Sequence, residues 1–150
     1  MKGDKKIIEI LQSMGASITV NHQNIRVNGG AKLHGIEIDC SDIPDLVPTL
    51  AVIATQAEGE TRLVNAASAR IKETDRLSSM AKELRRMEAD LEELNSSLII
   101  RKSTLHGANL HGYDDHRTVM ALAVAGMIAE GETKIDTAES IKKTFPNFVE

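Results

Sequence analysis

The chain has 150 residues, 41% of them hydrophobic and 27% charged, which is the composition of a globular protein large enough for one domain. A formal net charge of −4 argues against non-specific binding to nucleic acid or to anionic membranes. Tyr113, Phe145 and Phe148 are the only aromatic residues, so we expect an aliphatic core and no stacking platform for single-stranded nucleic acid. Cys40 is the only cysteine, which excludes an internal disulfide and a site of several thiolate ligands.

The sequence also gives an expectation of where the protein works. Lys2, Asp4, Lys5 and Lys6 interrupt any apolar start, so no secretion signal is predicted. The longest apolar run, 119–129, is too short to span a bilayer. We therefore predict a cytoplasmic protein that binds no membrane.

The first half of the chain alternates between helical and extended patterns. The apolar residues of 7–14 share a helical face, and Gly15 follows them as a helix terminator. Strands are predicted at 17–20, 24–27, 36–39 and 61–64. A buried helix is predicted from Asp42 to about residue 57, and Pro48 is expected to kink or delay it.

The second half shows the same order of elements. A helix is predicted over 77–87, because apolar residues recur there at helical spacing. Extended segments follow at 89–94, 98–101 and 108–110, then a buried helix at 115–129 and a strand at 133–136. The methionines at helical spacing are expected to fill the core; they are Met80, Met87, Met120 and Met127.

Short stretches of identical sequence connect the two halves. The letters LAV at 50–52 recur at 122–124, and EGET at 58–61 recurs at 130–133, so both pairs are separated by the same offset. Two copies of an α-β-β-β-α-β unit therefore fill the chain. No flexible linker separates them, which predicts one α/β domain over residues 1–150 with a sheet packed against buried helices.

The segment 70–76 is the densest group of charges beside an apolar helix. If the helix begins at Lys72, then Lys72, Glu73 and Arg76 project from one side of its first turn. A carboxylate between two cations can hold an anion and move a proton at the same place. The alternative is a solvated helix start with an internal ion pair.

Other charged residues lie at similar places. The segments 42–45 and 113–117 both precede predicted helices, and Lys143 follows the last strand as Lys72 follows the strand 61–64. Arg76, Arg117 and Lys143 would form a cationic cradle suited to phosphate and carboxylate groups.

Simpler interpretations of these residues remain open. Acidic residues before a helix also serve as N-caps, which applies to Asp42, Asp45, Asp114 and Asp115. Histidines recur every five residues at His106, His111 and His116, but this spacing fits no single helix face and predicts no metal site.

Three motifs in order resemble a known family. They are RIKETDRL at 70–77, DHR at 115–117 before the apolar MALA at 120–123, and KTFP at 143–146. Together they resemble the C-terminal lobe of the 5-enolpyruvylshikimate-3-phosphate synthases (3-phosphoshikimate 1-carboxyvinyltransferases), which are enolpyruvyl transferases. The resemblance covers nearly the whole chain.

The resemblance implies a fold and a missing partner. Family members have two lobes of repeated βαβαββ units packed around buried parallel helices, and the active site lies between the lobes. The chain would be most of one C-terminal lobe, and the N-terminal lobe would be absent. Met1 would then mark a fragment boundary or a split gene product, and the chain alone would be inactive.

The resemblance also implies a reaction and its residues. The family transfers the enolpyruvyl group of phosphoenolpyruvate to the 5-hydroxyl of shikimate 3-phosphate, without a metal or organic cofactor. By motif, Asp45 and Lys72 would contact the shikimate hydroxyls, and Asp45 would attract the 5-hydroxyl proton. Glu73 would transfer a proton at the phosphoenolpyruvate methylene, with His116 supporting Glu73 or the substrate. The phosphoenolpyruvate cradle would be formed by Arg76, Arg117 and Lys143.

Two departures from the family pattern and two alternatives remain. Glu88 replaces the usual glycine after the helix 77–87, where a left-handed backbone would be strained, and Pro48 is atypical. The alternatives are a non-catalytic anion-binding module of the same fold and a lobe of the UDP-N-acetylglucosamine enolpyruvyl transferase.

Overall fold

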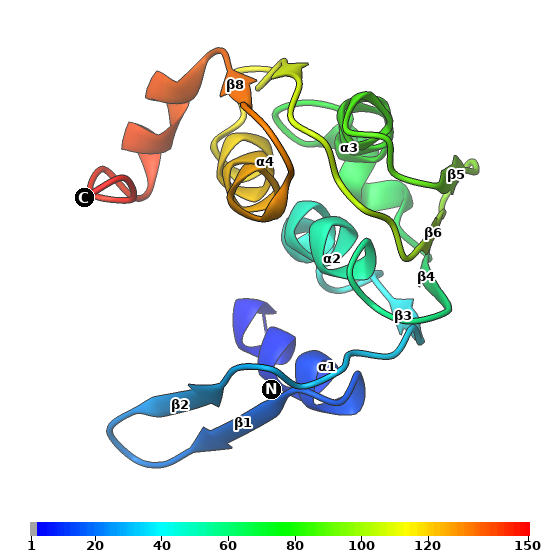
Figure 1. Cartoon of the computed structure of the whole chain (residues 1–150), viewed down its shortest axis with the longest axis vertical. Helices are drawn as coiled ribbons and strands as arrows, with labels where there is room; N and C mark the ends of the chain where they lie inside the picture. Colours follow the sequence, from blue (N-terminus) through cyan, green and yellow to red (C-terminus); the bar gives the residue numbers. More distant parts are fainter. Residues whose placement is uncertain (1–2) are drawn as a thin grey trace.

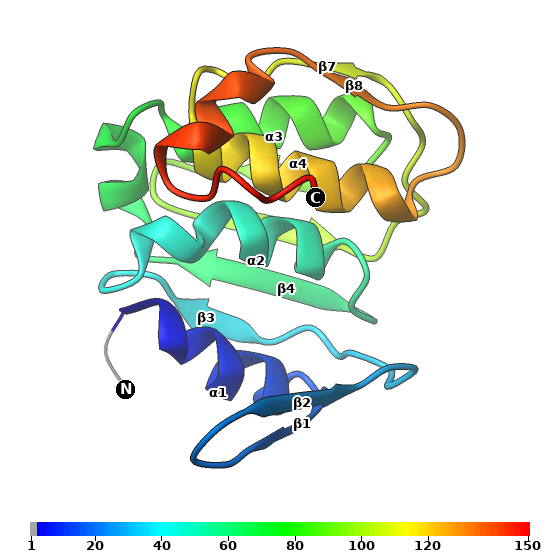
Figure 2. The same ribbon diagram turned by 90° about the vertical axis from the view of Figure 1, so that its left-hand side faces the viewer.

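The structure, a computed structural model, describes residues 3–150. Three helices form its centre, namely α2 (Val47–Ala54), α3 (Arg76–Arg86) and α4 (His116–Ile128), and a shorter helix, α1 (Lys6–Ser13), lies beside α2. The three central helices lie side by side and run in the same direction (Figures 1 and 2). None of the helices in residues 3–150 is long and apolar enough to cross a membrane.

A four-stranded sheet covers α2 and α3. Its strands are β3 (Glu37–Asp39), β4 (Glu60–Val64), β5 (Leu91–Glu93) and β6 (Leu98–Arg101), and their spatial order is β3-β4-β6-β5. The pair β3-β4 is parallel, and the other two pairs are antiparallel. From β3 to β6 the chain runs β-α-β-α-β-β around parallel helices, which confirms the predicted α/β class.

The remaining strands form two small sheets. The antiparallel hairpin of β1 (Ser17–Val20) and β2 (Ile25–Asn28) projects from the body in Figure 1 and is largely exposed. The parallel pair β7 (Asn109–Leu110) and β8 (Lys134–Ile135) lies beside α4. The predicted strands thus exist, and their bounds shift by one or two residues at the ends.

Short 3-10 helices connect these elements. They are η1 (Gly3–Lys5), η2 (Pro44–Leu46), η3 (Ala67–Ile71) and η4 (Ala138–Lys143). The helix predicted from Asp42 begins only at Val47, because η2 takes up the preceding residues and Pro48 occupies the first turn of α2. A proline is tolerated there, since first-turn N–H groups have no partner within the helix. Pro48 therefore delays the helix, as expected.

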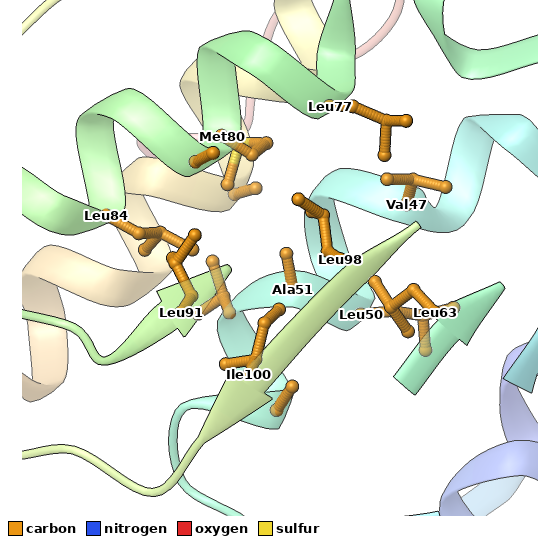
Figure 3. Close-up of a cluster of buried hydrophobic side chains, with 14 of the residues drawn as sticks. Val47, Leu50, Ala51, Leu63, Leu77, Met80, Leu84, Leu91, Leu98 and Ile100 are labelled. Atoms are coloured by element: carbon orange, nitrogen blue, oxygen red, sulfur yellow. The ribbon is translucent and has the colours of Figure 1, made fainter. Parts of the chain in front are cut away.

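The core is aliphatic, as the composition predicts. Side chains from α2 and α3 point toward those of β4, β5 and β6 in Figure 3, with Leu50, Leu77 and Leu98 among them. Met80 and Met87 are fully buried core residues, as predicted. Met127 is 83% exposed, so its prediction as core filler was wrong: it lies on the outer face near the end of α4.

Two helices are followed by a residue with a left-handed backbone, at the positions that the sequence indicated. Gly15 follows α1 with φ 105°, and Glu88 follows α3 with φ 68°. A side chain at such a φ is strained, and Glu88 Oε2 lies 2.7 Å from His106 Nδ1. Glu88 thus follows α3 in a left-handed conformation that glycine would adopt without strain.

Backbone contacts recur at equivalent positions of the two halves. His34 forms a parallel bridge with Glu58, and His106 forms the same bridge with Glu130. The glycine after each histidine donates its N–H to the carbonyl of the bridged glutamate at 2.7 Å. A Cβ on Gly35 or Gly107 would lie 2.1 Å from a backbone oxygen, that of Glu60 or Glu132 respectively. At both places the two backbone segments therefore lie so close together that only glycine fits.

This contact predicts equal intolerance at the two glycines. Gly35→Ala and Gly107→Ala should each lower the free energy of unfolding by about 1–3 kcal/mol, because the added methyl group meets backbone that cannot rotate away. Gly29→Ala is the control, since no atom lies within 4 Å of the position that its methyl group would take. Denaturant unfolding of the three variants measures the difference. Equal stability of all three would contradict the close approach.

Candidate functional site

The N-terminal ends of α2, α3 and α4 lie on the same side of the molecule (Figure 2). The charged residues singled out in the sequence gather at this end. They come from η2, from the loop 72–75 before α3, from the starts of α3 and α4, and from the end of η4. Free N–H groups of helix starts and cationic side chains together favour anionic ligands at such a place.

Arg76 is at the centre of this cluster and is only 1% exposed. Its Nη1 donates to Asp45 Oδ1 at 2.6 Å, and its Nη2 donates to Glu73 Oε2 at 2.7 Å. Its Nε and Nη2 donate to the two carboxylate oxygens of Asp115 at 2.9 and 3.1 Å. Three carboxylates from three parts of the chain therefore surround one buried guanidinium.

Asp115 is fully buried and is the N-cap of α4, where its side chain accepts from the backbone N–H of Arg117. Burial opposes its charged form, but hydrogen bonds from Arg76 and Thr118 outweigh this and lower the pKa of its carboxyl group. Asp115 is therefore an anion at neutral pH and neutralises Arg76.

Asp45 lies in η2 and is 41% exposed. Partial burial opposes its charge, but the hydrogen bond from Arg76 and the charges of Arg117 and Lys72 lower the pKa of its carboxyl group. The Nζ of Lys72 lies 3.5 Å from Asp45 Oδ1. Asp45, Lys72 and Arg76 are thus brought together, as the motifs predict.

The condition that the helix begins at Lys72 is not met, and α3 starts one residue before the predicted 77–87. α3 begins at Arg76, because the side chain of Asp75 accepts from the backbone N–H of Ser78 and caps the helix there. Lys72 and Glu73 lie in the preceding loop. Glu73 is 44% exposed, so it contacts Arg76 while facing solvent.

Arg117 lies next to this cluster at the start of α4. Its Nη1 donates to the backbone carbonyl of Asp45 at 3.2 Å, and its Nη2 donates to Asp4 Oδ2 at 3.0 Å. The contact with Asp4 was not predicted from the sequence. Because 113 positions separate the two residues, no local pattern could have indicated it.

Lys143 and His116 lie at the margin of the cluster. The Nζ of Lys143 donates to the backbone carbonyl of Asp114 at 3.2 Å, at the loop that leads into α4. His116 is buried at the start of α4, and its Nδ1 has no hydrogen-bond partner within residues 3–150. A carboxylate oxygen of its neighbour, Asp115 Oδ1, lies 3.8 Å from this Nδ1.

The simpler interpretations are now decided for several residues. Asp42 and Asp114 are not N-caps: the caps of η2 and α2 are Ile43 and Leu46, and that of α4 is Asp115. A polar residue caps a helix only where its backbone is extended, whereas Asp114 has φ 53°. In the described part of the chain, no three histidine, cysteine or acidic side chains are grouped as metal ligands.

The charge cluster should also determine how stability depends on pH. The pKa of Asp115 is lower in the folded chain than its ordinary value of 3.8, so its contribution to stability is present above that value. The contribution is lost as the pH falls through the lowered pKa. Arg76→Met should therefore cost about 3–5 kcal/mol at pH 7, because Asp115 remains buried without its counter-ion, and less at pH 3.

Urea unfolding at pH 7 and pH 3 checks this expectation. Arg62→Met is the matched control, because Arg62 forms an exposed pair with Glu60 and should change stability little at either pH. A loss for Arg76→Met that is independent of pH would show that packing, rather than the buried charge pair, is responsible.

Comparisons with known proteins agree with this arrangement. The sequence model of the family described as EPSP synthase (3-phosphoshikimate 1-carboxyvinyltransferase) matches residues 1–150. The 3-phosphoshikimate 1-carboxyvinyltransferases of Ruminiclostridium cellulolyticum and Methanocaldococcus jannaschii are 55% and 50% identical to this chain, covering 99% of it and 35% of each relative. An EPSP synthase structure from Acinetobacter baumannii superposes with a TM-score of 0.87 at 31% identity, over 95% of this chain and 36% of that one. The chain spans about a third of the length of these relatives. It belongs to the EPSP synthase family.

Proposed function

We propose that the chain forms part of an enzyme that transfers the enolpyruvyl group of phosphoenolpyruvate to the 5-hydroxyl of shikimate 3-phosphate and releases phosphate. The observation that carries the proposal is the buried Arg76 between Asp45, Glu73 and Asp115, with Lys72 and Arg117 beside it. Such a site offers cations for the phosphate and carboxylate of one substrate. It also offers carboxylates for the hydroxyls and protons of the other.

The substrate-binding roles follow from position and chemistry. Arg76, Arg117 and Lys143 would hold the phosphoenolpyruvate anion, the two arginines by paired N–H groups and Lys143 as a point charge at the rim. Asp45 and Lys72 would contact the hydroxyls of shikimate 3-phosphate. Their ion pair places an acceptor and a donor side by side.

The proton-transfer roles belong to the accessible acids. Asp45 would accept the proton of the 5-hydroxyl while the oxygen of that hydroxyl attacks C2 of phosphoenolpyruvate. Glu73 would donate a proton to C3, and His116 would support Glu73 or the substrate. The Glu73 carboxylate would then take a proton back from C3, while the C2–oxygen bond to phosphate breaks, phosphate leaves and the enolpyruvyl double bond is restored. The buried cations would stabilise the anionic intermediate, and the proposal includes no metal or organic cofactor.

The proposal includes a partner and a location. Residues 1–150 would form one domain, with the two internal copies that the repeated letters mark, inside the C-terminal lobe of a two-lobe enzyme. Because the chain spans about a third of its relatives, the remaining polypeptide, including an N-terminal lobe, would complete the cleft, and the chain alone would be inactive. The proposed location is the cytoplasm.

Burial raises the pKa of Cys40 to about 12 and keeps its thiol protonated.

A chimeric enzyme tests the proposal. The matching 149 residues of the Ruminiclostridium cellulolyticum relative would be replaced by this chain, since the two are 55% identical there. We expect the chimera to convert phosphoenolpyruvate and shikimate 3-phosphate, and the isolated chain to show no turnover. A folded chimera that binds phosphoenolpyruvate without turnover would favour a non-catalytic anion-binding module. Turnover of UDP-N-acetylglucosamine instead would favour the sibling transferase.

Glu73 gives the sharpest single-residue test. In the chimera, Glu73→Gln keeps the size of the side chain but removes its acid, so turnover should fall by about 10²-fold or more. Glu9→Gln makes the same change on the exposed face of α1 and should leave turnover unchanged. Steady-state kinetics of both variants measure the effect. A near wild-type rate for Glu73→Gln would remove Glu73 from the proton-transfer role.

A further inference from the structure

We propose that Asp115 is a positioning residue that fixes both arginines of the anion cradle. It would set which edge of the Arg76 guanidinium faces the substrate, and it would set the start of the helix that carries Arg117. This inference rests on the proposed function, in which Arg76 and Arg117 bind phosphoenolpyruvate.

Each of the two carboxylate oxygens of Asp115 accepts two hydrogen bonds. Oδ1 accepts from Arg76 Nη2 at 3.1 Å and from the backbone N–H of Arg117 at 3.2 Å. Oδ2 accepts from Arg76 Nε at 2.9 Å and from the hydroxyl of Thr118 at 2.8 Å. Each oxygen therefore holds Arg76 on one side and the first turn of α4 on the other.

A guanidinium has two edges that can each bind a carboxylate or phosphate through paired N–H groups. Asp115 occupies the edge formed by Nε and Nη2 of Arg76. The edge formed by Nη1 and Nη2 then points to Asp45 and Glu73, which are both partly exposed. The buried carboxylate thus reserves the inner edge for itself and presents the outer edge to the accessible side of the cluster.

The burial of the three acids distinguishes their roles. Asp45 and Glu73 can turn toward solvent or substrate, because 41% and 44% of their side chains are exposed. Asp115 is fully buried and caps the start of α4. It therefore remains the counter-ion of Arg76 when the other two acids exchange partners, and it touches no reacting atom.

Asp75 provides a matched control for Asp115. Asp75 caps α3 as Asp115 caps α4, and it binds the guanidinium of Arg70 through both of its oxygens at 3.1 and 2.9 Å. Asp75 is 39% exposed, and its ion pair is with Arg70 rather than with Arg76. Asparagine caps a helix as well as aspartate does, so an Asp→Asn change at either position can keep the cap, while it removes the charge and replaces one acceptor oxygen by an NH2 donor.

The experiment compares Asp115→Asn with Asp75→Asn in the chimeric enzyme. Asp115→Asn should raise the KM for phosphoenolpyruvate about 10-fold or more and leave the KM for shikimate 3-phosphate within about twofold. Thr118→Val removes the hydroxyl that orients Oδ2 of Asp115. This variant should also raise the KM for phosphoenolpyruvate, but by a smaller factor than Asp115→Asn. Asp75→Asn should leave both constants within about twofold.

Loss of thermal stability alone would overturn the proposal. So would an equal rise in both KM values after Asp115→Asn, because a general loss of shape would explain either result. A chimera that turns over nothing would count against the proposed function, and the positioning role would then be measured in the ¹⁵N-labelled isolated chain. There the Nε–H signal of Arg76 should exchange slowly with water and lose this protection in Asp115→Asn but not in Asp75→Asn. Unchanged protection in Asp115→Asn would overturn the role.

Discussion

The positive charge of Arg76 has almost no access to water, and the arrangement of the site depends on how that charge is compensated. Taking a guanidinium out of water costs several kcal/mol unless anions and hydrogen bonds replace its hydration. Here the compensation comes from a loop, a 3-10 helix and a helix cap that are far apart in sequence. The starts of α2, α3 and α4 must therefore meet at one place for the charge to be tolerated.

The backbone supplies the rigidity that this meeting requires. The helices pack through aliphatic side chains against a sheet whose strands come from both halves of the chain. At Gly35 and Gly107 the chain passes as close as glycine allows to Glu60 and Glu132, which follow α2 and α4. The charged side chains at the helix starts therefore stay close to one another, since a close-packed aliphatic core keeps the helices from shifting.

Local patterns in the sequence identified most elements, because helices and strands bury residues at fixed periods. The start of α3 was predicted to within one residue, and the N-cap Asp75 before the apolar run at Leu77 is the signal that marks it. Charges at the predicted helix starts singled out the segments of Asp45, Glu73 and Arg76, whereas the separate roles proposed for these residues came from the motifs they share with a known family. The pairing of Arg76 with Asp115 and of Arg117 with Asp4 joins residues 39 and 113 positions apart. Such pairs depend on tertiary packing, which no local period encodes.

The balance of charge in the cluster has a consequence for how a ligand arrives. Asp4, Asp45, Glu73 and Asp115 form ion pairs with Lys72, Arg76 and Arg117, so four carboxylates face three cations, while Lys143 contacts a backbone carbonyl at the margin. Fields from opposite charges so close together largely cancel, so these residues attract distant anions less than a basic cleft would. An anion would be selected only on contact, by exchanging places with a carboxylate that is already bound. The exchange of partners by these side chains would then be one step in the capture of the anion.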